Sequence, residues 1–252
     1  MVSALSGFIR KPEDLSVKYL SISGECMTEG MSRAIRRGFP NAEIYCGYGL
    51  SEASPRVAYL PHTLFDRVPT ATGFPVSEVI VRLVDEEGAT IIQPMKTGEI
   101  VIHGPNVMLG YFNDPDRTSR VLRNGWLHTG DLAYWNDSGL LCVQGRADDM
   151  IIRAGMNIYP VEIENTLSTD PRVKDVFVYA YKKGETQEIG MKICGDFSDT
   201  LEVIELCHKL LPKFQIPSKI ELADQTNVLS GGKKKRKNWL SRLFGIGKRR
   251  KK

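Results

Sequence analysis

Residues 145–164 read GRADDMIIRAGMNIYPVEIE, and they crowd charged side chains, two glycines and a proline around short apolar runs. An ordinary strand, loop and helix rarely needs so many special residues in so short a stretch. Carboxylates accept hydrogen bonds and hold hard cations such as Mg²⁺, whereas arginine and lysine bind anions. Similar residue types stand beside glycines in CGYGLSE (46–52), GWLHTGD (125–131) and SGGKKKR (230–236). These four stretches are the candidates for a site that binds a polar ligand.

The elements that must position the first candidate residues have the pattern of a doubly wound sheet. A buried strand is predicted over 16–24, and a second strand over 42–52 runs into a glycine-containing loop. Between them, residues 28–39 have apolar residues at helical spacing after Thr28, which is suited to cap a helix. A strand, a helix and a strand in this order are typical of the final part of an α/β sheet.

Two further segments with different patterns of predicted secondary structure follow along the chain. Residues 79–143 alternate short β segments with turn residues, which predicts a small antiparallel sheet or barrel. From Gly145 onward, a strand, a helix with Pro160 in its first turn, a hairpin, a second helix and a last strand predict a compact α+β unit. The predicted organisation is a large-domain portion over 1–144 with a β-rich subdomain at about 75–144, a small domain over 145–237 and a basic tail over 238–252.

The charge of the chain is concentrated near its end. Residues 233–252 hold 11 of the 34 lysines and arginines and no acid, so the rest of the chain has 23 basic against 30 acidic residues. Apolar residues at 239–240 and 243–244 would form one edge of a helix flanked by cations, which suits an anionic membrane surface or a polyanion. The alternative is a solvated tail or a frame-shifted extension. No base-reading motif accompanies the tail, so nucleic acid is not expected as a partner.

Composition also indicates where the chain works. The five cysteines are scattered without a CxxC pair, which favours thiols of a reducing compartment over a metal site or a disulfide framework. No apolar run approaches the ~20 residues of a membrane span, and MVSALSGFIRKPEDL lacks the apolar core of a signal peptide. We therefore expect a cytoplasmic protein. The alternative is a cytoplasmic protein that attaches peripherally to a membrane through the tail.

In order and spacing, four motifs resemble the adenylate-forming superfamily, which includes acyl- and aryl-CoA synthetases, adenylation domains of peptide synthetases and beetle luciferases. They are CGYGLSEASP, GEIVIHGPNVMLGYFNDP, GWLHTGDLAYWNDSG and GRADDMIIRAGMNIYPVEIE. The resemblance implies that ATP and Mg²⁺ activate a small carboxylic acid to an acyl-adenylate. The acyl group then passes to a thiol, either of coenzyme A or of a carrier protein's phosphopantetheine. It also implies that the small C-terminal domain is a lid that rotates on a hinge.

The resemblance assigns the first group of residues to the base and phosphates of the nucleotide. Tyr48 would stack near adenine, Ser51 would donate its hydroxyl to the α-phosphate, and Glu52 would hold Mg²⁺. Ser51 stands where relatives have threonine, and this change keeps the hydroxyl. The loop expected over adenine consists of Gly24, Glu25 and Cys26.

The second group of residues is assigned to the ribose, the hinge and the thiol. Asp131 would accept both ribose hydroxyls, and Arg146 would bind ribose or phosphate. Asp148 would be the hinge, and Gly155 would line the thiol tunnel, where the missing Cβ leaves room for a pantetheine arm. Lys233 would bridge the substrate carboxylate and the α-phosphate, and the alternative is that it is merely the first residue of the basic tail.

Two parts of the family pattern are not found in this sequence: the phosphate loop ending in Lys-Gly and most of the acyl pocket. Three interpretations stay open. The chain is the C-terminal half of a split synthetase that pairs with a separate chain, a gene remnant, or a non-catalytic nucleotide- or partner-binding module. We rank ligase chemistry first. The segment GPNVMLGYFNDPDRT resembles medium- or long-chain acyl-CoA and aryl-CoA synthetases more than amino-acid adenylation domains, which implies a fatty or aryl acid as the substrate.

Overall fold

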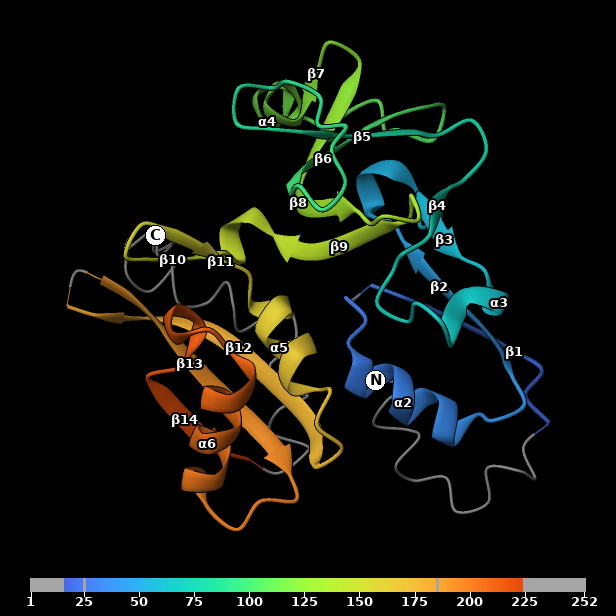
Figure 1. Cartoon of the computed structure of the whole chain (residues 1–252). Coiled ribbons are helices and arrows are strands. Elements are labelled where there is room, and N and C mark those ends of the chain that lie inside the picture. The colour runs from blue at the N-terminus through green and yellow to red at the C-terminus, as the bar shows by residue number, and fades with distance from the viewer. Residues whose placement is uncertain (1–15, 25, 185, 224–252) are drawn as a thin grey trace, which may run out of the picture. The chain divides into compact units, whose positions relative to one another are not determined.

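The computed structural model describes residues 16–24, 26–184 and 186–223, which form two compact units that divide between Met150 and Ile151 (Figure 1). The sequence had suggested a boundary six positions earlier, at 144/145. Residues up to Arg146 stay with the first unit because the last strand of that unit pairs with its neighbour as far as this residue. Glu25, Lys233 and the basic tail lie outside the described residues. No helix in the described part of the chain has both the length and the apolar character that crossing a membrane requires.

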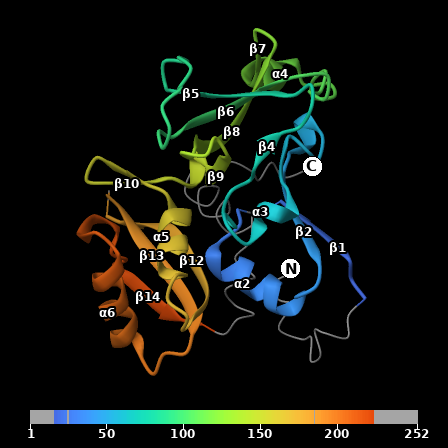
Figure 2. The ribbon, with the colours of Figure 1, turned by 45° about the vertical axis from the view of Figure 1, so that its right-hand side comes forward.

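The first unit contains a four-stranded sheet in the order β1-β2-β3-β4 (Figure 2). The pair β1 and β2 is parallel, with Ser23 opposite Gly47, and helix α2 connects the two strands. The N–H of Met31 donates to the hydroxyl of Thr28 at 3.2 Å, which confirms the predicted cap. The elements are β1 (Tyr19–Ser23), α2 (Glu29–Gly38), β2 (Glu43–Tyr48), η2 (Ser51–Ala53), β3 (Ala58–Leu60), α3 (His62–Phe65) and β4 (Phe74–Pro75).

The first unit continues into a five-stranded antiparallel sheet, in which β9 pairs with β8 beside the path β5-β6-β8-β7. The sequence predicts an antiparallel sheet within residues 79–143, and the structure has one. Within this range Thr90 lies outside the named strands and forms only an isolated bridge, to Val84. The elements are β5 (Ile80–Val84), β6 (Gly98–His103), α4 (Pro115–Val121), β7 (Leu122–Arg123), β8 (Trp126–Trp135), β9 (Leu141–Arg146) and η3 (Ala147–Asp149).

The second unit is a three-stranded sheet covered by two helices, preceded by a short hairpin. Strands β12 and β13 form the predicted antiparallel hairpin, and β14 adds parallel to β13. Pro160 occupies the first turn of α5, as expected. The elements are β10 (Ile151–Arg153), β11 (Met156–Ile158), α5 (Pro160–Leu167), β12 (Val173–Lys183), β13 (Thr186–Gly195), α6 (Thr200–Leu210), η4 (Lys213–Gln215) and β14 (Lys219–Leu222).

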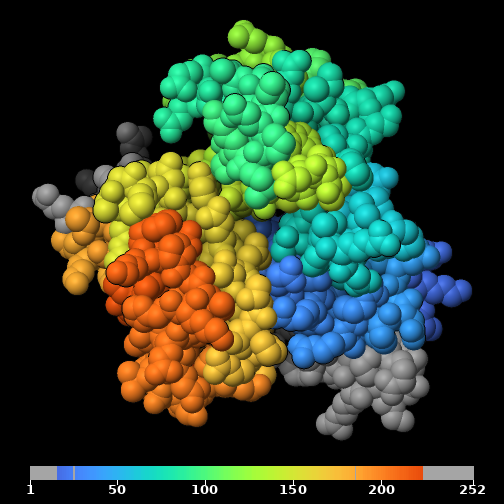
Figure 3. All heavy atoms as spheres, viewed as in Figure 1, coloured from blue at the N-terminus to red at the C-terminus, as the bar shows by residue number. Residues whose placement is uncertain are grey.

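Each unit has its own buried apolar residues. The core of the second unit uses side chains from Ile151 to Leu211, with partly buried neighbours as far as Ile220. The two clusters of the first unit draw only on residues before Gln144. Figure 3 shows the same division by colour, with the first unit running from blue to yellow-green and the second from yellow to red. The candidate residues up to Asp148 therefore belong to one unit, and Gly155 belongs to the other.

Candidate functional site

Three of the predicted residues come together at the junction of the two sheets of the first unit. The hydroxyl of Tyr48 donates to Oδ2 of Asp131 at 2.6 Å. The guanidinium of Arg146 forms an ion pair with Oδ1 of the same carboxylate, with 3.3 Å between the atoms. The Asp131 side chain is 13% exposed and that of Arg146 is 42% exposed, so the carboxylate is largely enclosed while the arginine reaches the surface.

The strands explain why these residues meet. Tyr48 is the last residue of β2, and Asp131 and Arg146 are directly opposite each other on β8 and β9. The ladder between β8 and β9 shifts register between Leu132 and Ala133, one residue after the aspartate. Such irregularities re-aim side chains and are frequent beside functional sites.

Hydrogen bonds fix the part of β8 that precedes Asp131, where the ladder between β6 and β8 is irregular. Glu99 on β6 accepts from the N–H of Gly130 at 2.9 Å, and its other oxygen lies 2.9 Å from Nδ1 of His128. The hydroxyl of Thr129 donates to the carbonyl of Ile100 and accepts from the N–H of Asp131. The contact between His128 and Glu99 thus joins β8 to β6.

Gly130 is favoured by the conformation of the backbone, and it lies close to the side chain of Arg146. Its φ of +69° is one that side-chain-bearing residues rarely adopt. A Cβ at this position would also lie 3.1 Å from a guanidinium nitrogen of Arg146. The glycine thus lets the arginine lie against the backbone of β8 beside Asp131.

The electrostatics of the cluster keep Tyr48 protonated. Burial, followed by the negative charge of Asp131, raises the pKa of the Tyr48 hydroxyl. The phenol is therefore a hydrogen-bond donor throughout the neutral and mildly alkaline range. The carboxylate of Asp131 stays an acceptor, a chemistry suited to binding hydroxyl groups.

The remaining predicted residues of the first unit follow the ends of β1 and β2. Because these strands are parallel, with Ser23 opposite Gly47, the loops that contain Gly24 and Ser51 leave the same edge of the sheet. Gly24 has a φ of +96° and Cys26 is half-buried. Ser51 is exposed at the start of η2, and Glu52 beside it is half-buried. Loops at the carboxyl edge of such sheets are where α/β proteins bind ligands.

Glu52 makes a contact that the sequence did not predict. The hydroxyl of Tyr111 donates to Oε1 of Glu52 at 2.8 Å. The backbone carbonyl of Glu52 accepts from the N–H of Met108 at 2.8 Å, and the carbonyl of Ala53 accepts from the side chain of Asn106 at 2.6 Å. The loop after β6 is therefore attached to η2 at three points. The only feature of the sequence that could have indicated these contacts is the presence of polar side chains within the motif GPNVMLGYFNDP.

The donor set around Glu52 fits a Mg²⁺ ion only as part of a larger site. In the part of the chain that the structure describes, no group of three or more histidine, cysteine or acidic side chains could hold a metal. Mg²⁺ is commonly bound through one or two carboxylates together with waters and substrate phosphates. A single carboxylate such as Glu52 fits this pattern if a phosphate-bearing ligand supplies the other oxygens.

Asp148 and Gly155 lie on opposite sides of the division between the units. Asp148 is exposed in η3, two residues before Met150. Gly155 is exposed in the two-residue turn between β10 and β11, at a φ of +77°. Nothing lies within 4 Å of the position of an added Cβ, so its own turn requires this glycine for conformation.

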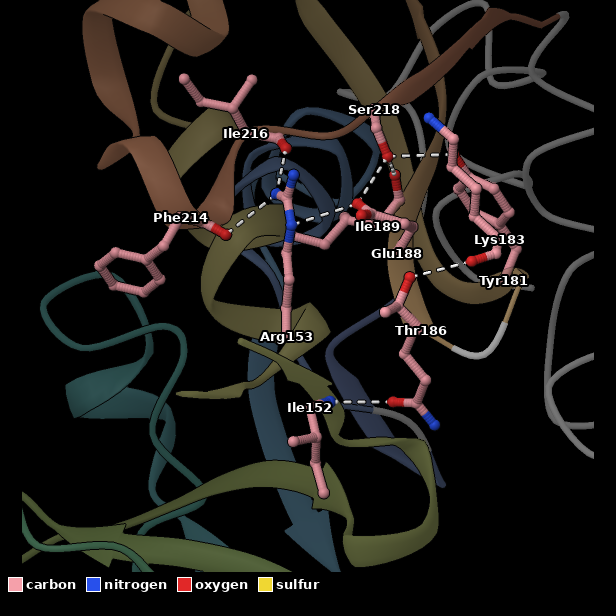
Figure 4. A network of polar contacts seen from close by, with 11 residues as sticks. Ile152, Arg153, Tyr181, Lys183, Thr186, Glu188, Ile189, Phe214, Ile216 and Ser218 are labelled. Carbon is pink, nitrogen blue, oxygen red and sulfur yellow. Dashed lines mark hydrogen bonds and ion pairs between the residues drawn. The ribbon is translucent and has the colours of Figure 1, made fainter. Parts of the chain in front are cut away.

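Arg153 holds the hairpin that contains Gly155 (Figure 4). Its Nε lies 3.1 Å from a carboxylate oxygen of Glu188 on β13. One terminal nitrogen donates to the carbonyl oxygens of Phe214 and Ile216 at 3.2 and 2.9 Å. Ser218 donates to the same Glu188 oxygen at 3.0 Å. One side chain thereby connects β10, β13 and the segment leading to β14.

Comparison with known proteins gives the class of this fold and site. Residues 3–112 match the model of the AMP-binding enzyme family. The chain is 36% identical over 191 residues to the long-chain-fatty-acid–CoA ligase of Escherichia coli O157:H7, which covers 74% of this chain and 34% of that protein. It is 34% identical over 192 residues to the 2-succinylbenzoate–CoA ligase of Bacillus mycoides strain KBAB4, covering 75% of this chain and 39% of that protein.

Solved structures agree with these relatives. An amide bond synthetase from Marinactinospora thermotolerans has a TM-score of 0.78 at 26% identity and covers 88% of this chain and 46% of its own. O-succinylbenzoate coenzyme A synthetase from Bacillus subtilis, in complex with ATP and magnesium ion, has a TM-score of 0.71 at 26% identity, with the same coverage. The chain belongs to the adenylate-forming, AMP-binding enzymes and corresponds to their C-terminal portion. It spans about a third of the length of the curated relatives that it matches.

Proposed function

We propose that this chain provides the ribose-binding and lid portions of an ATP-dependent ligase that joins a carboxylic acid to a thiol. The proposal includes a separate chain that supplies the phosphate loop and most of the acyl pocket. The complete site would form an acyl-adenylate and pyrophosphate from the acid and ATP. It would then transfer the acyl group to coenzyme A or a carrier protein's phosphopantetheine.

The observation that supports this proposal most strongly is the convergence of Tyr48, Asp131 and Arg146. The Tyr48 hydroxyl and the Arg146 guanidinium contact different oxygens of one carboxylate. An enclosed, ionised carboxylate can accept hydrogen bonds from two neighbouring hydroxyl groups, as a ribose presents them. Arg146 is half in solvent and can bind the ribose or a phosphate from the open side.

The residues at the edge of the four-stranded sheet would bind the rest of the nucleotide. Gly24 and Cys26 would lie over adenine together with Glu25, while Ser51 would donate its hydroxyl to the α-phosphate. Glu52 would hold Mg²⁺, and Lys233 would contact the substrate carboxylate and the α-phosphate. When bound, Mg²⁺ supplies positive charge against the phosphate oxygens.

The second unit would act as the lid. Asp148 is proposed as the hinge because it is exposed and only two residues from the division between the units. After adenylation, rotation at Asp148 would bring the hairpin turn at Gly155 to the thiol. Arg153 supports this role because it ties the hairpin to the rest of its own unit.

The second candidate function is a nucleotide- or partner-binding module without catalysis. It is supported by the cluster of Tyr48, Asp131 and Arg146, since all three residues lie within the first unit. This candidate predicts AMP binding without turnover. We propose a fatty or aryl acid as the substrate, because the motif after β6 resembles that of acyl- and aryl-CoA synthetases.

AMP binding by the purified full chain tests the shared core of these proposals. We expect Asp131→Asn to weaken AMP binding by about ten- to a hundredfold, because a charge-assisted hydrogen bond contributes about 1.5–3 kcal/mol. The measurement is isothermal titration calorimetry with AMP. Asp137→Asn, in the exposed turn between β8 and β9, is the matched control and should bind as the original chain does.

Turnover distinguishes the two candidates. The chain is mixed with ATP, Mg²⁺ and a panel of fatty and aryl acids, with and without a candidate partner chain that carries a phosphate loop. Pyrophosphate release only in the presence of the partner supports the split ligase. Release from the chain alone would contradict the need for a partner, and AMP binding without release in any mixture would favour the binding module.

A further inference from the structure

Tyr111 reaches Glu52 from a different part of the first unit, on the loop between β6 and α4. Its hydroxyl donates to Oε1 of Glu52 at 2.8 Å. The guanidinium carbon of Arg117 lies 3.8 Å from the centre of the tyrosine ring, and the N–H of Tyr111 donates to the hydroxyl of Thr118. The ring and the backbone of this residue are therefore both fixed by α4.

The same loop also holds the backbone on which Glu52 sits. Met108 donates its N–H to the carbonyl of Glu52, and Asn106 donates from its side chain to the carbonyl of Ala53. A loop attached to η2 by two such bonds delivers the Tyr111 hydroxyl to a defined position. The contact between Tyr111 and Glu52 is thus part of a three-point attachment and not a single surface hydrogen bond.

We propose that Tyr111 is a positioning residue for Glu52, which it orients to receive a divalent cation bound to a phosphate ligand. The proposal rests on the proposed function of Glu52. With Oε1 hydrogen-bonded to the tyrosine, the rotation of the carboxylate is restricted, and Oε2 is the oxygen that remains for the cation. Among the residues that the structure describes, Oε2 accepts no hydrogen bond.

The test separates metal-dependent from metal-independent nucleotide binding. The variant is Tyr111→Phe, which removes one oxygen and keeps the ring beside Arg117. Calorimetry on the full chain measures AMP without metal, ATP with EDTA and ATP with Mg²⁺. We expect Tyr111→Phe to reduce the gain in ATP affinity caused by Mg²⁺ by about three- to tenfold, and to change AMP affinity by less than about twofold.

Two other variants complete the design. Glu52→Gln should remove the gain caused by Mg²⁺, because it removes the charge that would face the cation. Tyr59→Phe, on β3, loses an exposed tyrosine hydroxyl of the same unit and should behave as the original chain.

The outcomes distinguish the positioning role from the proposed function. If Tyr111→Phe keeps the full gain from Mg²⁺ while the original chain binds AMP, the positioning role is overturned and the nucleotide site stands. Loss of AMP binding in Tyr111→Phe would also overturn it, since the residue would then be only structural. The same holds if Glu52→Gln keeps the gain. If the original chain binds no nucleotide at all, the proposed function fails, and the positioning role fails with it.

Discussion

At Asp131, one carboxylate is held by two side chains before any ligand binds. An enclosed carboxylate is costly unless it is paired, and Tyr48 and Arg146 provide a donor to each oxygen. A carboxylate offers about four acceptor directions, so it can keep both contacts and still accept hydrogen bonds from hydroxyl groups. The sequence indicated all three residues from their types and motifs. It could not indicate that the Tyr48 hydroxyl points to Asp131, because the two are 83 positions apart and only the sheet junction brings them together.

Tyr48 should make the stability of the first unit depend on alkaline pH. Its pKa in the folded chain is raised, by burial first and then by Asp131, above the usual value of about 10. The unfolded state therefore loses this proton first, and the folded state is favoured less as the pH rises above about 10. We expect the free energy of unfolding to begin to fall near pH 10 and to keep falling at higher pH, and to fall less in Tyr48→Phe.

Urea titrations followed by circular dichroism at several pH values measure this difference. At neutral pH, Tyr48→Phe should cost about 1–3 kcal/mol, because Asp131 loses a donor. Tyr59→Phe is the control, since its side chain is exposed. Parallel pH profiles for the original chain and Tyr48→Phe would show that the hydroxyl titrates in the folded state as it does in the unfolded chain.

Comparison of the predicted with the observed helices shows which sequence features made an element predictable. Thr28 before α2 and Pro160 in α5 marked helix starts that the structure has at these places. Helix α4 was not predicted, although Asp114 caps it and Pro115 opens it, because none of its residues is buried and no apolar period exists. The contact of Tyr111 with Glu52 was not predicted either, because Glu52 lies on η2, 59 positions earlier in the chain.

The guanidinium group of Arg153 connects the hairpin β10–β11 to the rest of the second unit. A guanidinium can bind Glu188 and two carbonyl groups at once, whereas a lysine is a compact charge that cannot span them. We expect Arg153→Lys to keep the folded chain but to destabilise the second unit by about 1 kcal/mol. The turn at Gly155 should also exchange its amide hydrogens faster.

Hydrogen exchange followed by mass spectrometry tests this prediction directly. The expected change is confined to residues 151–158 and 214–218, where the contacts of Arg153 lie. Arg172→Lys is the control, because Arg172 pairs with Asp170 at the exposed start of β12. Unchanged exchange at 151–158 in Arg153→Lys would mean that the backbone pairing of β10 and β11 stabilises the hairpin without Arg153.

The whole molecule has buried thiols in both units, and these can report on each unit separately. Cys46 and Cys142 lie in the core of the first unit, and Cys207 lies in the core of the second. Burial raises the pKa of Cys46 to about 12 and that of Cys207 to about 11. Neither thiol is reactive at neutral pH while its core is folded, since the thiolate is the reactive form. Alkylation at each cysteine therefore measures the opening of the core that contains it.

Separate cores predict separate unfolding. Leu206 is 3% exposed and packs only among residues of the second unit. We expect Leu206→Ala to destabilise that unit by about 2–5 kcal/mol, because it leaves a cavity in the core. The urea concentration at which Cys207 becomes alkylated should fall, while that for Cys46 stays the same. Ile44→Ala, in the first unit, should do the opposite, since Ile44 is fully buried beside Cys46. Mass spectrometry of the alkylated peptides gives both midpoints from one titration. A lid that rotates between two half-reactions must keep its own fold while its contacts change, so a common shift of both midpoints would contradict the separate lid on which the proposed transfer step depends.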